Sequence, residues 1–414
     1  MFTEHRERLS ELLVDDSMLL LYSGIPTHVS QDEYYPLRAN RNFFWLTGLC
    51  REGMLLFMTK RGGKVQSTLY IEEPDPHNIR WTGKMVTIDE AKEISGIDDI
   101  RYTDRIEGDI SAYMAYDTTD TVYFDCQRHS TSDLPDYNLV KAEEFLKKYP
   151  YVKLLNLHTP TAKLRRSKDA QEVERIKAAI ELTRYGLERV MSTLHPGIHE
   201  YEAQAEFEYE IFRRGAEGPS FPTIAGAGPN GCMLHYETNR EICRDGDLLL
   251  LDLGAKLDGY CADITRTYPI NGKFSERQRQ YYDIVLRANR EVAKRARPGL
   301  TTRDLNDICK EVLADGLIEM GKISDRSEIS KYYMHGVSHH LGIDVHDADV
   351  MEGRELMVGA VISDEPGLYI DEEGIGIRIE DDLLITEDGA LVLSEDIIRT
   401  PDEIEAFMAE HSKN

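Results

Sequence analysis

The sequence predicts a two-domain α/β protein, and three observations support this fold class. A chain of 414 residues exceeds the size at which a single hydrophobic core usually stops growing. Its first part alternates strand-like and helix-like segments, which is typical of a mixed sheet covered by helices. Its second part contains two similar successions of helix, histidine and strand pair. We therefore expect a mixed-sheet α/β domain at 1–162 and a second domain at 163–414.

Short apolar runs in the first domain predict buried strands. SMLLLY and GMLLFMT are continuously apolar and too short for helices, and KRGGK after the second run is typical of a hairpin turn. The expected strands are 17–22, 53–59, 65–71, 121–125 and 152–155, and the expected helices are 6–13 and 139–148.

A long amphipathic helix is expected to open the second domain. Ser167 can cap it, and Pro196-Gly197 is a stop signal at its other end. A second Pro-Gly follows another helix-like segment 102 residues later, and His235 and His339 are 104 residues apart. Each histidine precedes a strand pair with two acids. These spacings predict a duplicated unit whose two copies face one another across a pseudo-twofold axis.

Five metal-liking side chains lie at the ends of, or inside, the strand-like runs of this domain. They are Asp252, Asp263, His339, Glu365 and Glu380. Carboxylates are poor strand formers, and burying an unpaired one costs several kcal/mol. Two divalent cations would supply the compensating charge. This oxygen-rich set favours Mn²⁺, with Co²⁺, Fe²⁺ or Zn²⁺ as alternatives, whereas a structural zinc site would use thiolates.

Local patterns predict how these side chains meet. A tight turn centred between Leu257 and Asp258 would place Asp252 opposite Asp263, or one step off. Each residue alone also has an ordinary explanation: a turn acid, a hydrogen-bonded core histidine or, for Glu380, membership of a solvated acidic run at 380–382. The set as a whole favours the metal interpretation.

Composition limits the partners and the compartment. The net charge of −26 argues against nucleic acid, and no apolar run is long enough to span a membrane. Six scattered cysteines without a C-x-x-C pair suit reduced thiols, and the charged N-terminus lacks a signal peptide's apolar core. We therefore expect a cytoplasmic protein without nucleic-acid or membrane partners.

The motifs around the five side chains resemble those of the pita-bread metallopeptidases, which include aminopeptidase P, prolidase and methionine aminopeptidase. The matching patterns are D-L-G, A-D-x-T-R, H-G-x-S-H-x-L-G, E-P-G and G-I-R-I-E. Segment 32–49 is also similar to the N-terminal domain of bacterial aminopeptidase P. The resemblance implies a pita-bread fold for the second domain, preceded by an aminopeptidase P-like domain.

The resemblance also implies roles for the five ligands. Asp252 would hold one metal, His339 and Glu365 the other, and Asp263 and Glu380 would bridge both. Glu365 would also carry a proton from the attacking water to the leaving nitrogen.

Six further residues receive roles from the resemblance. His235 and His346 would bind substrate and stabilise the tetrahedral intermediate, and His335 would support the site. Arg378 would orient Glu380 or bind substrate, and Arg354 would bind a carboxylate. Trp81 would line the site of a neighbouring subunit.

The implied activity is hydrolysis of the N-terminal Xaa–Pro bond of peptides by a homo-oligomer, a dimer or tetramer. Prolidase, which cleaves Xaa–Pro dipeptides, is the alternative. The short stretch between His346 and Glu365 favours longer peptides. A metal-free relative, such as creatinase or a peptide- or histone-binding module, is the third hypothesis, although such members typically lose ligands.

Overall fold

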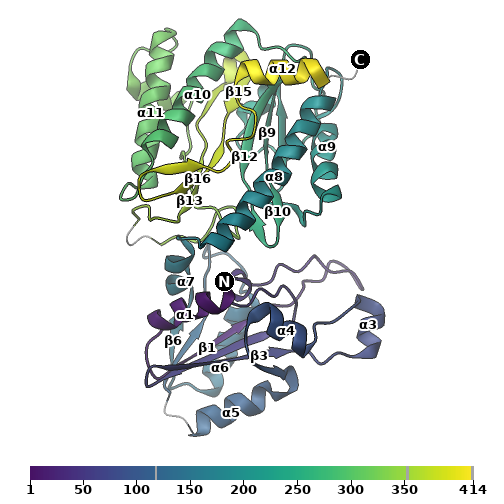
Figure 1. Cartoon of the computed structure of the whole chain (residues 1–414), viewed down its shortest axis with the longest axis vertical. Coiled ribbons are helices and arrows are strands. Elements are labelled where there is room, and N and C mark those ends of the chain that lie inside the picture. The colour runs from purple at the N-terminus through teal and green to yellow at the C-terminus, as the bar shows by residue number, and fades with distance from the viewer. Residues whose placement is uncertain (117–118, 351–353, 412–414) are drawn as a thin grey trace. The chain divides into compact units, whose positions relative to one another are not determined.

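Residues 1–116, 119–350 and 354–411 are described by a computed structural model of the chain (Figure 1). The chain divides into two units, Met1–Leu164 and Arg165–Asn414, each with its own core. Among the described residues, no helix is both long and apolar enough to cross a membrane.

The strand-like runs of the first unit join in one six-stranded mixed sheet. Its order is β4-β3-β2-β1-β5-β6, with antiparallel pairs β1–β2 and β2–β3 and parallel pairs β3–β4, β1–β5 and β5–β6. The strands are β1 Ser17–Tyr22, β2 Leu55–Arg61, β3 Lys64–Ile71, β4 Asp99–Tyr102, β5 Thr121–Phe124 and β6 Lys153–Asn156. All five predicted strands are confirmed, and β4 is an addition.

Helices cover this sheet. They are α1 Phe2–Leu12, α2 Arg41–Thr47, α3 Pro76–Thr82, α4 Ile88–Ser95, α5 Ile106–Tyr116, α6 Tyr137–Lys148 and α7 His158–Arg165. The two predicted helices correspond to α1 and α6. Tertiary packing explains why α2 was missed: its central residues 43–46 form a short, continuously apolar run with no helical period, and Trp45 is fully buried.

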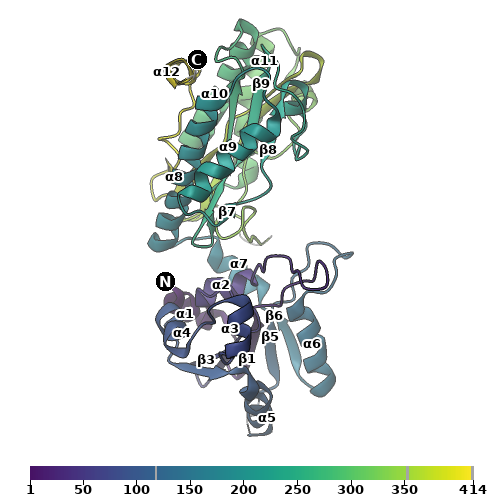
Figure 2. The ribbon, with the colours of Figure 1, turned by 90° about the vertical axis from the view of Figure 1, so that its right-hand side faces the viewer.

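Two long helix pairs dominate the second unit. They are α8 Ala170–Thr193 with α9 Glu200–Arg213, and α10 Glu276–Arg295 with α11 Thr302–Glu319, followed by α12 Pro401–His411 at the end of the chain. Figures 1 and 2 show each pair side by side, with the strands between the pairs. The expected cap of α8 was wrong. Asp169 caps this helix, whereas the hydroxyl of Ser167 donates to the carbonyl of Val358.

Short antiparallel sheets carry the site residues. The sheets are β11-β10-β7, β12-β9-β8, β13-β16-β17 and β14-β15. Their strands are β7 Gly218–Pro219, β8 Ile224–Ala227, β9 Leu248–Leu253, β10 Ala255–Leu257, β11 Tyr260–Cys261, β12 Ile264–Pro269, β13 Val361–Asp364, β14 Gly367–Ile370, β15 Ile375–Arg378, β16 Asp381–Ile385 and β17 Ala390–Val392. Each helix pair thus precedes an antiparallel set, which is the repeated order that the sequence predicted.

The register of the first hairpin differs from the prediction. Asp252 pairs with Thr265, so Asp263 lies two positions from the place opposite Asp252. The turn consists of Asp258 and Gly259, with φ of 47° and 80°. A two-residue hairpin turn of type I′ requires positive φ at both central residues, and Asp-Gly meets that requirement better than the expected Leu-Asp. The two acids are therefore diagonal neighbours.

Candidate metal centre and active site

The strands bring the predicted ligands to one place in the second unit. Asp252 lies on β9, Asp263 directly precedes β12, Glu365 follows β13, and Glu380 lies between β15 and β16. His339 is held beside β13 because its carbonyl accepts from the amide of Ser363 at 2.9 Å.

Four of these side chains form a tight cluster. Nε2 of His339 lies 3.3 Å from Oδ2 of Asp263 and 3.5 Å from Oε1 of Glu365. Donor atoms of Asp263, His339 and Glu380 all lie within 4.8 Å of one another. The side chains of Asp263 and Glu380 are almost fully buried. The structure therefore places the acids near one imidazole and away from water.

Asp252 joins the cluster through Arg378 and Thr265. Nη2 of Arg378 donates to Oδ2 of Asp252 at 2.6 Å, and its Nε donates to Oγ1 of Thr265 at 3.1 Å. Thr265 in turn donates to Oε2 of Glu380 at 2.7 Å. Arg378 thus hydrogen-bonds Asp252 directly and is connected to Glu380 by hydrogen bonds through Thr265, in addition to its charge interaction with Glu380. Thr265 was missed, although it is the threonine of the A-D-x-T-R motif.

Burial dominates the electrostatics of the cluster. It raises the pKa of Asp263, raises that of Glu365 to about 7 and raises that of Glu380 well above its ordinary value, and neighbouring carboxylates add to each shift. For His339, burial alone would lower the pKa, but the hydrogen bond to Asp263 and the nearby negative charges outweigh it and raise the pKa to about 9. The cluster therefore favours added positive charge.

The donor set fits divalent cations. Oδ1 of Asp252 is buried and has no hydrogen-bond partner among the described residues. Nδ1 of His339 lies 3.1 Å from the carbonyl of His340, so this nitrogen can donate its proton there and leave Nε2 free to face the carboxylates. Such a backbone bond is the usual support of a metal-binding histidine. Carboxylates with one imidazole suit Mn²⁺, Fe²⁺, Co²⁺ or Zn²⁺.

Two further histidines adjoin the cluster. Nε2 of His335 lies 2.8 Å from the hydroxyl of Tyr369, and its Nδ1 lies 3.6 Å from Oε2 of Glu365. The ring of His346 is 4.1 Å from that of His339. Desolvation, with the positive charge of Arg378 or of His339, lowers the pKa of His335 and of His346 to about 4. Both are therefore neutral at pH 7.

Three other predicted residues lie on exposed segments. His235 follows the 3₁₀ turn Gly228–Cys232 that continues β8. Arg354 is exposed in the segment between His346 and β13. Trp81 belongs to the first unit, where it lies on α3 and is 77% exposed.

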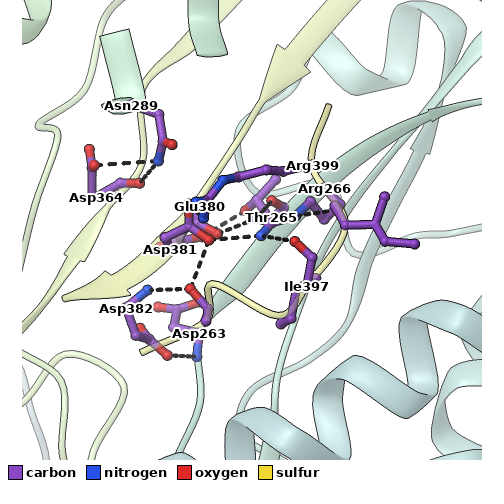
Figure 3. Close-up of polar contacts among 12 residues, drawn as sticks. Asp263, Thr265, Arg266, Asn289, Asp364, Glu380, Asp381, Asp382, Ile397 and Arg399 are labelled. Atoms are coloured by element: carbon purple, nitrogen blue, oxygen red, sulfur yellow. Dashed lines mark hydrogen bonds and ion pairs between the residues drawn. The ribbon is translucent and has the colours of Figure 1, made fainter. Parts of the chain in front are cut away.

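The acidic run at 380–382 is buried, so its interpretation as a solvated run was wrong. Asp381 accepts from Arg266 at 2.7 Å, from Ser394 at 2.7 Å and from Arg399 at 3.1 Å (Figure 3). Arg266 also donates to the carbonyl of Glu380 at 2.5 Å. These cations hold the backbone behind the cluster in place.

The fold and the site define a metal-dependent hydrolase. Residues 174–387 match metallopeptidase family M24, and residues 2–123 match the aminopeptidase P N-terminal domain. The chain belongs to metallopeptidase family M24. This confirms the predicted resemblance and the predicted fold class, and it implies divalent metal ions.

Individual relatives match over the whole chain. The Xaa-Pro aminopeptidase of Escherichia coli K12 is 34% identical over 98% of this chain and 97% of its own length. A Bacillus anthracis structure provisionally named an aminopeptidase P superposes with a TM-score of 0.97 at 42% identity, covering 100% and 99% of the two chains. Zinc-substituted E. coli aminopeptidase P in complex with product gives 0.90 at 32% identity, covering 100% and 98%.

Proposed function

We propose that this chain is a metal-dependent aminopeptidase that releases the first residue from peptides with proline in second position. The observation that carries the proposal is the buried Asp263–His339–Glu380 cluster, in a chain that matches Xaa-Pro aminopeptidases from end to end. Proline removes the amide donor from the scissile bond, so a peptidase for this bond must position the substrate through other groups.

The proposed cofactor is a pair of divalent cations, with Mn²⁺ as the native metal. Asp252 would hold one, His339 and Glu365 the other, and Asp263 and Glu380 both. When bound, the cations supply Lewis-acid polarisation of the carbonyl and a lowered pKa for the attacking water.

Glu365 is proposed to move the proton during the reaction. It lies beside both His339 and His335, and its raised pKa suits proton transfer near neutral pH. His346 and His235 would donate hydrogen bonds to the substrate and to the developing oxyanion. The low pKa of His346 makes it a neutral donor.

The other predicted residues complete the proposed site. His335 supports Glu365, and Arg378 orients Asp252 and, through Thr265, Glu380. Arg354 would bind a substrate carboxylate, and Trp81 would line the site of a neighbouring subunit in a dimer or tetramer. In this proposal 1–162 is the N-terminal domain and 163–414 is the catalytic domain of a cytoplasmic protein.

Peptides of matched composition test the activity. We expect Mn²⁺-loaded protein to cleave Xaa–Pro–Yaa tripeptides and to ignore the same peptides with alanine in place of proline. Asp263→Ala should abolish cleavage. Cleavage that persists in this variant, or the absence of cleavage with every metal, would refute the proposal. A strong preference for Xaa–Pro dipeptides would identify a prolidase instead.

A further inference from the structure

The segment Arg165–Lys168 begins the second unit and runs along the stretch that contains and follows His346. The sequence suggested a domain boundary near this segment and a helix cap at Ser167. In the structure, Ser167 donates to the carbonyl of Val358 at 2.8 Å, and the amide of Lys168 donates to the carbonyl of Gly359 at 2.8 Å. We call Arg165–Lys168 the anchor segment.

Two cations of the anchor segment enclose one carboxylate. Arg165 forms an ion pair with Oδ1 of Asp347, and Nζ of Lys168 lies 3.1 Å from Oδ2. The exposed fractions of the three side chains are 4%, 1% and 2% for Arg165, Lys168 and Asp347. Both carboxylate oxygens are thus engaged in a nearly dry environment. Because separating buried charges is costly, Asp347 has little freedom to move.

This carboxylate adjoins a residue of the proposed active site. Asp347 follows His346 directly, and Arg165 also donates to Asp344 at 2.8 Å, so charges fix the backbone on both sides of His346. The amide of Asp347 donates to the carbonyl of His340 at 2.8 Å. These contacts explain why the ring of His346 packs 4.1 Å from that of His339.

We propose that Arg165 and Lys168 are positioning residues for His346. They hold Asp347 and thereby keep the His346 imidazole beside the ligand cluster, where it can reach the substrate carbonyl. The inference rests on the proposed function, since the role of His346 belongs to it. The competing explanation is that the charges stabilise the second unit without any particular effect on His346.

A double-mutant cycle separates the two explanations. Lys168→Met should lower kcat on an Xaa–Pro–Yaa peptide by on the order of 10- to 100-fold, because small displacements of catalytic groups have effects of this size. In a His346→Ala background the same substitution should cause no further loss. Lys168→Arg, which keeps the charge, should recover most of the rate. Equal losses in both backgrounds would overturn the proposal.

A milder variant and a control guard against misfolding. Asp344→Asn removes one partner of Arg165 but leaves Asp347, so we expect a smaller kcat loss that again disappears in the His346→Ala background. No loss from Asp344→Asn in folded protein would contradict the proposal. Arg189→Met is the control, because it also removes ion pairs of the second unit but none of the anchor segment. Arg189 on α8 pairs with Glu206 and Glu210 on α9. Its kcat should match wild type.

A structural readout keeps this proposal distinct from the proposed function. In a crystal structure of Lys168→Met without substrate, the His346 ring should move away from His339, while Asp263 stays in contact with His339. Unchanged positions would refute the positioning role. If wild type fails to cleave any Xaa–Pro peptide, the proposed function fails, and the crystal structure alone decides the positioning role.

Discussion

Arg378 donates a 2.6 Å hydrogen bond to Asp252, and this pair sets the direction of the surrounding hydrogen bonds. A guanidinium can only donate. Arg378 also donates to the hydroxyls of Thr265 and Tyr369, so each hydroxyl keeps its own proton for another partner. Thr265 donates to Glu380. Nδ1 of His335 lies 2.7 Å from the carbonyl of Gly336, which can only accept, so Nε2 of the neutral ring is unprotonated and accepts from Tyr369.

Arg378→Lys should damage the centre although it conserves the charge. A lysine cannot reproduce three donor directions from one planar group. We expect a fall in kcat of roughly 100-fold, together with weaker binding of Mn²⁺ to metal-free protein in calorimetric titrations. Wild-type metal affinity in this variant would show that Asp252 does not need the guanidinium.

Thr265 offers a matched pair of substitutions. Thr265→Val keeps the shape but removes the donor to Glu380, whereas Thr265→Ser keeps the hydroxyl. Loss of such an outer partner typically costs 10- to 100-fold in metal affinity. We expect that loss for valine and a value near wild type for serine. Similar affinities for the two variants would mean that the hydroxyl has no orienting role.

The metal-free protein should lose stability as pH rises. The pKa of Glu365 is raised from 4.5 to about 7, so between these values the unfolded chain holds fewer protons than the folded one, and folding becomes less favourable. The pKa of His339 is raised from 6.5 to about 9, so its contribution is complete below 6.5 and is lost as pH rises through 9.

Thermal unfolding at a series of pH values checks this prediction. With a chelator present, the melting temperature should fall between pH 7 and 9, above the range in which the lowered pKa values of His335 and His346 oppose the trend, and added Mn²⁺ should raise it most at the alkaline end. The Asp263→Asn variant should show a smaller response to metal. A chelated protein whose melting temperature rises steadily over this range would contradict the assigned pKa shifts.

Gly376 permits a close approach that a side chain would prevent. A Cβ atom there would overlap the carbonyl of Gly231, in the turn that leads to His235. Gly376→Ala should destabilise the protein by about 1–3 kcal/mol and lower kcat/KM. Gly108→Ala is the control, since Gly108 lies in α5 with nothing near the added methyl, and it should be neutral or stabilising by up to about 1 kcal/mol. Denaturant unfolding and peptide kinetics measure both variants.

The ligand candidates could be predicted from sequence because acids at the ends of apolar strands are unusual without a cation. Asp263 and Glu380 were recognisable for this reason, and the structure brings them together with His339. The repeated order of helices and strands could also be predicted, since the first helix of each pair, α8 or α10, is followed by a Pro-Gly signal that the sequence displays.

Contacts between distant parts of the chain determined the features that the sequence did not predict correctly. The register of Asp252 depended on which two residues form a turn, and two adjacent choices looked similar in sequence. Ser167 is a good helix cap by composition, yet its hydroxyl bonds to Val358, far along the chain. The buried state of Asp381 depends on Arg266 and Arg399, whose proximity no local pattern reveals.

The two repeats contribute unequal parts to one centre: Asp252 and Asp263 come from the first, and His339, Glu365 and Glu380 from the second. Backbone bonds join the two repeats, among them the bond from the amide of Glu380 to the carbonyl of Thr265 at 3.0 Å and the bond from the amide of Cys261 to the carbonyl of Gly342 at 2.9 Å. If each repeat were expressed as a separate fragment, neither fragment would contain all five proposed ligands. When the two fragments are mixed, binding of the cations would therefore indicate that they had reassociated correctly.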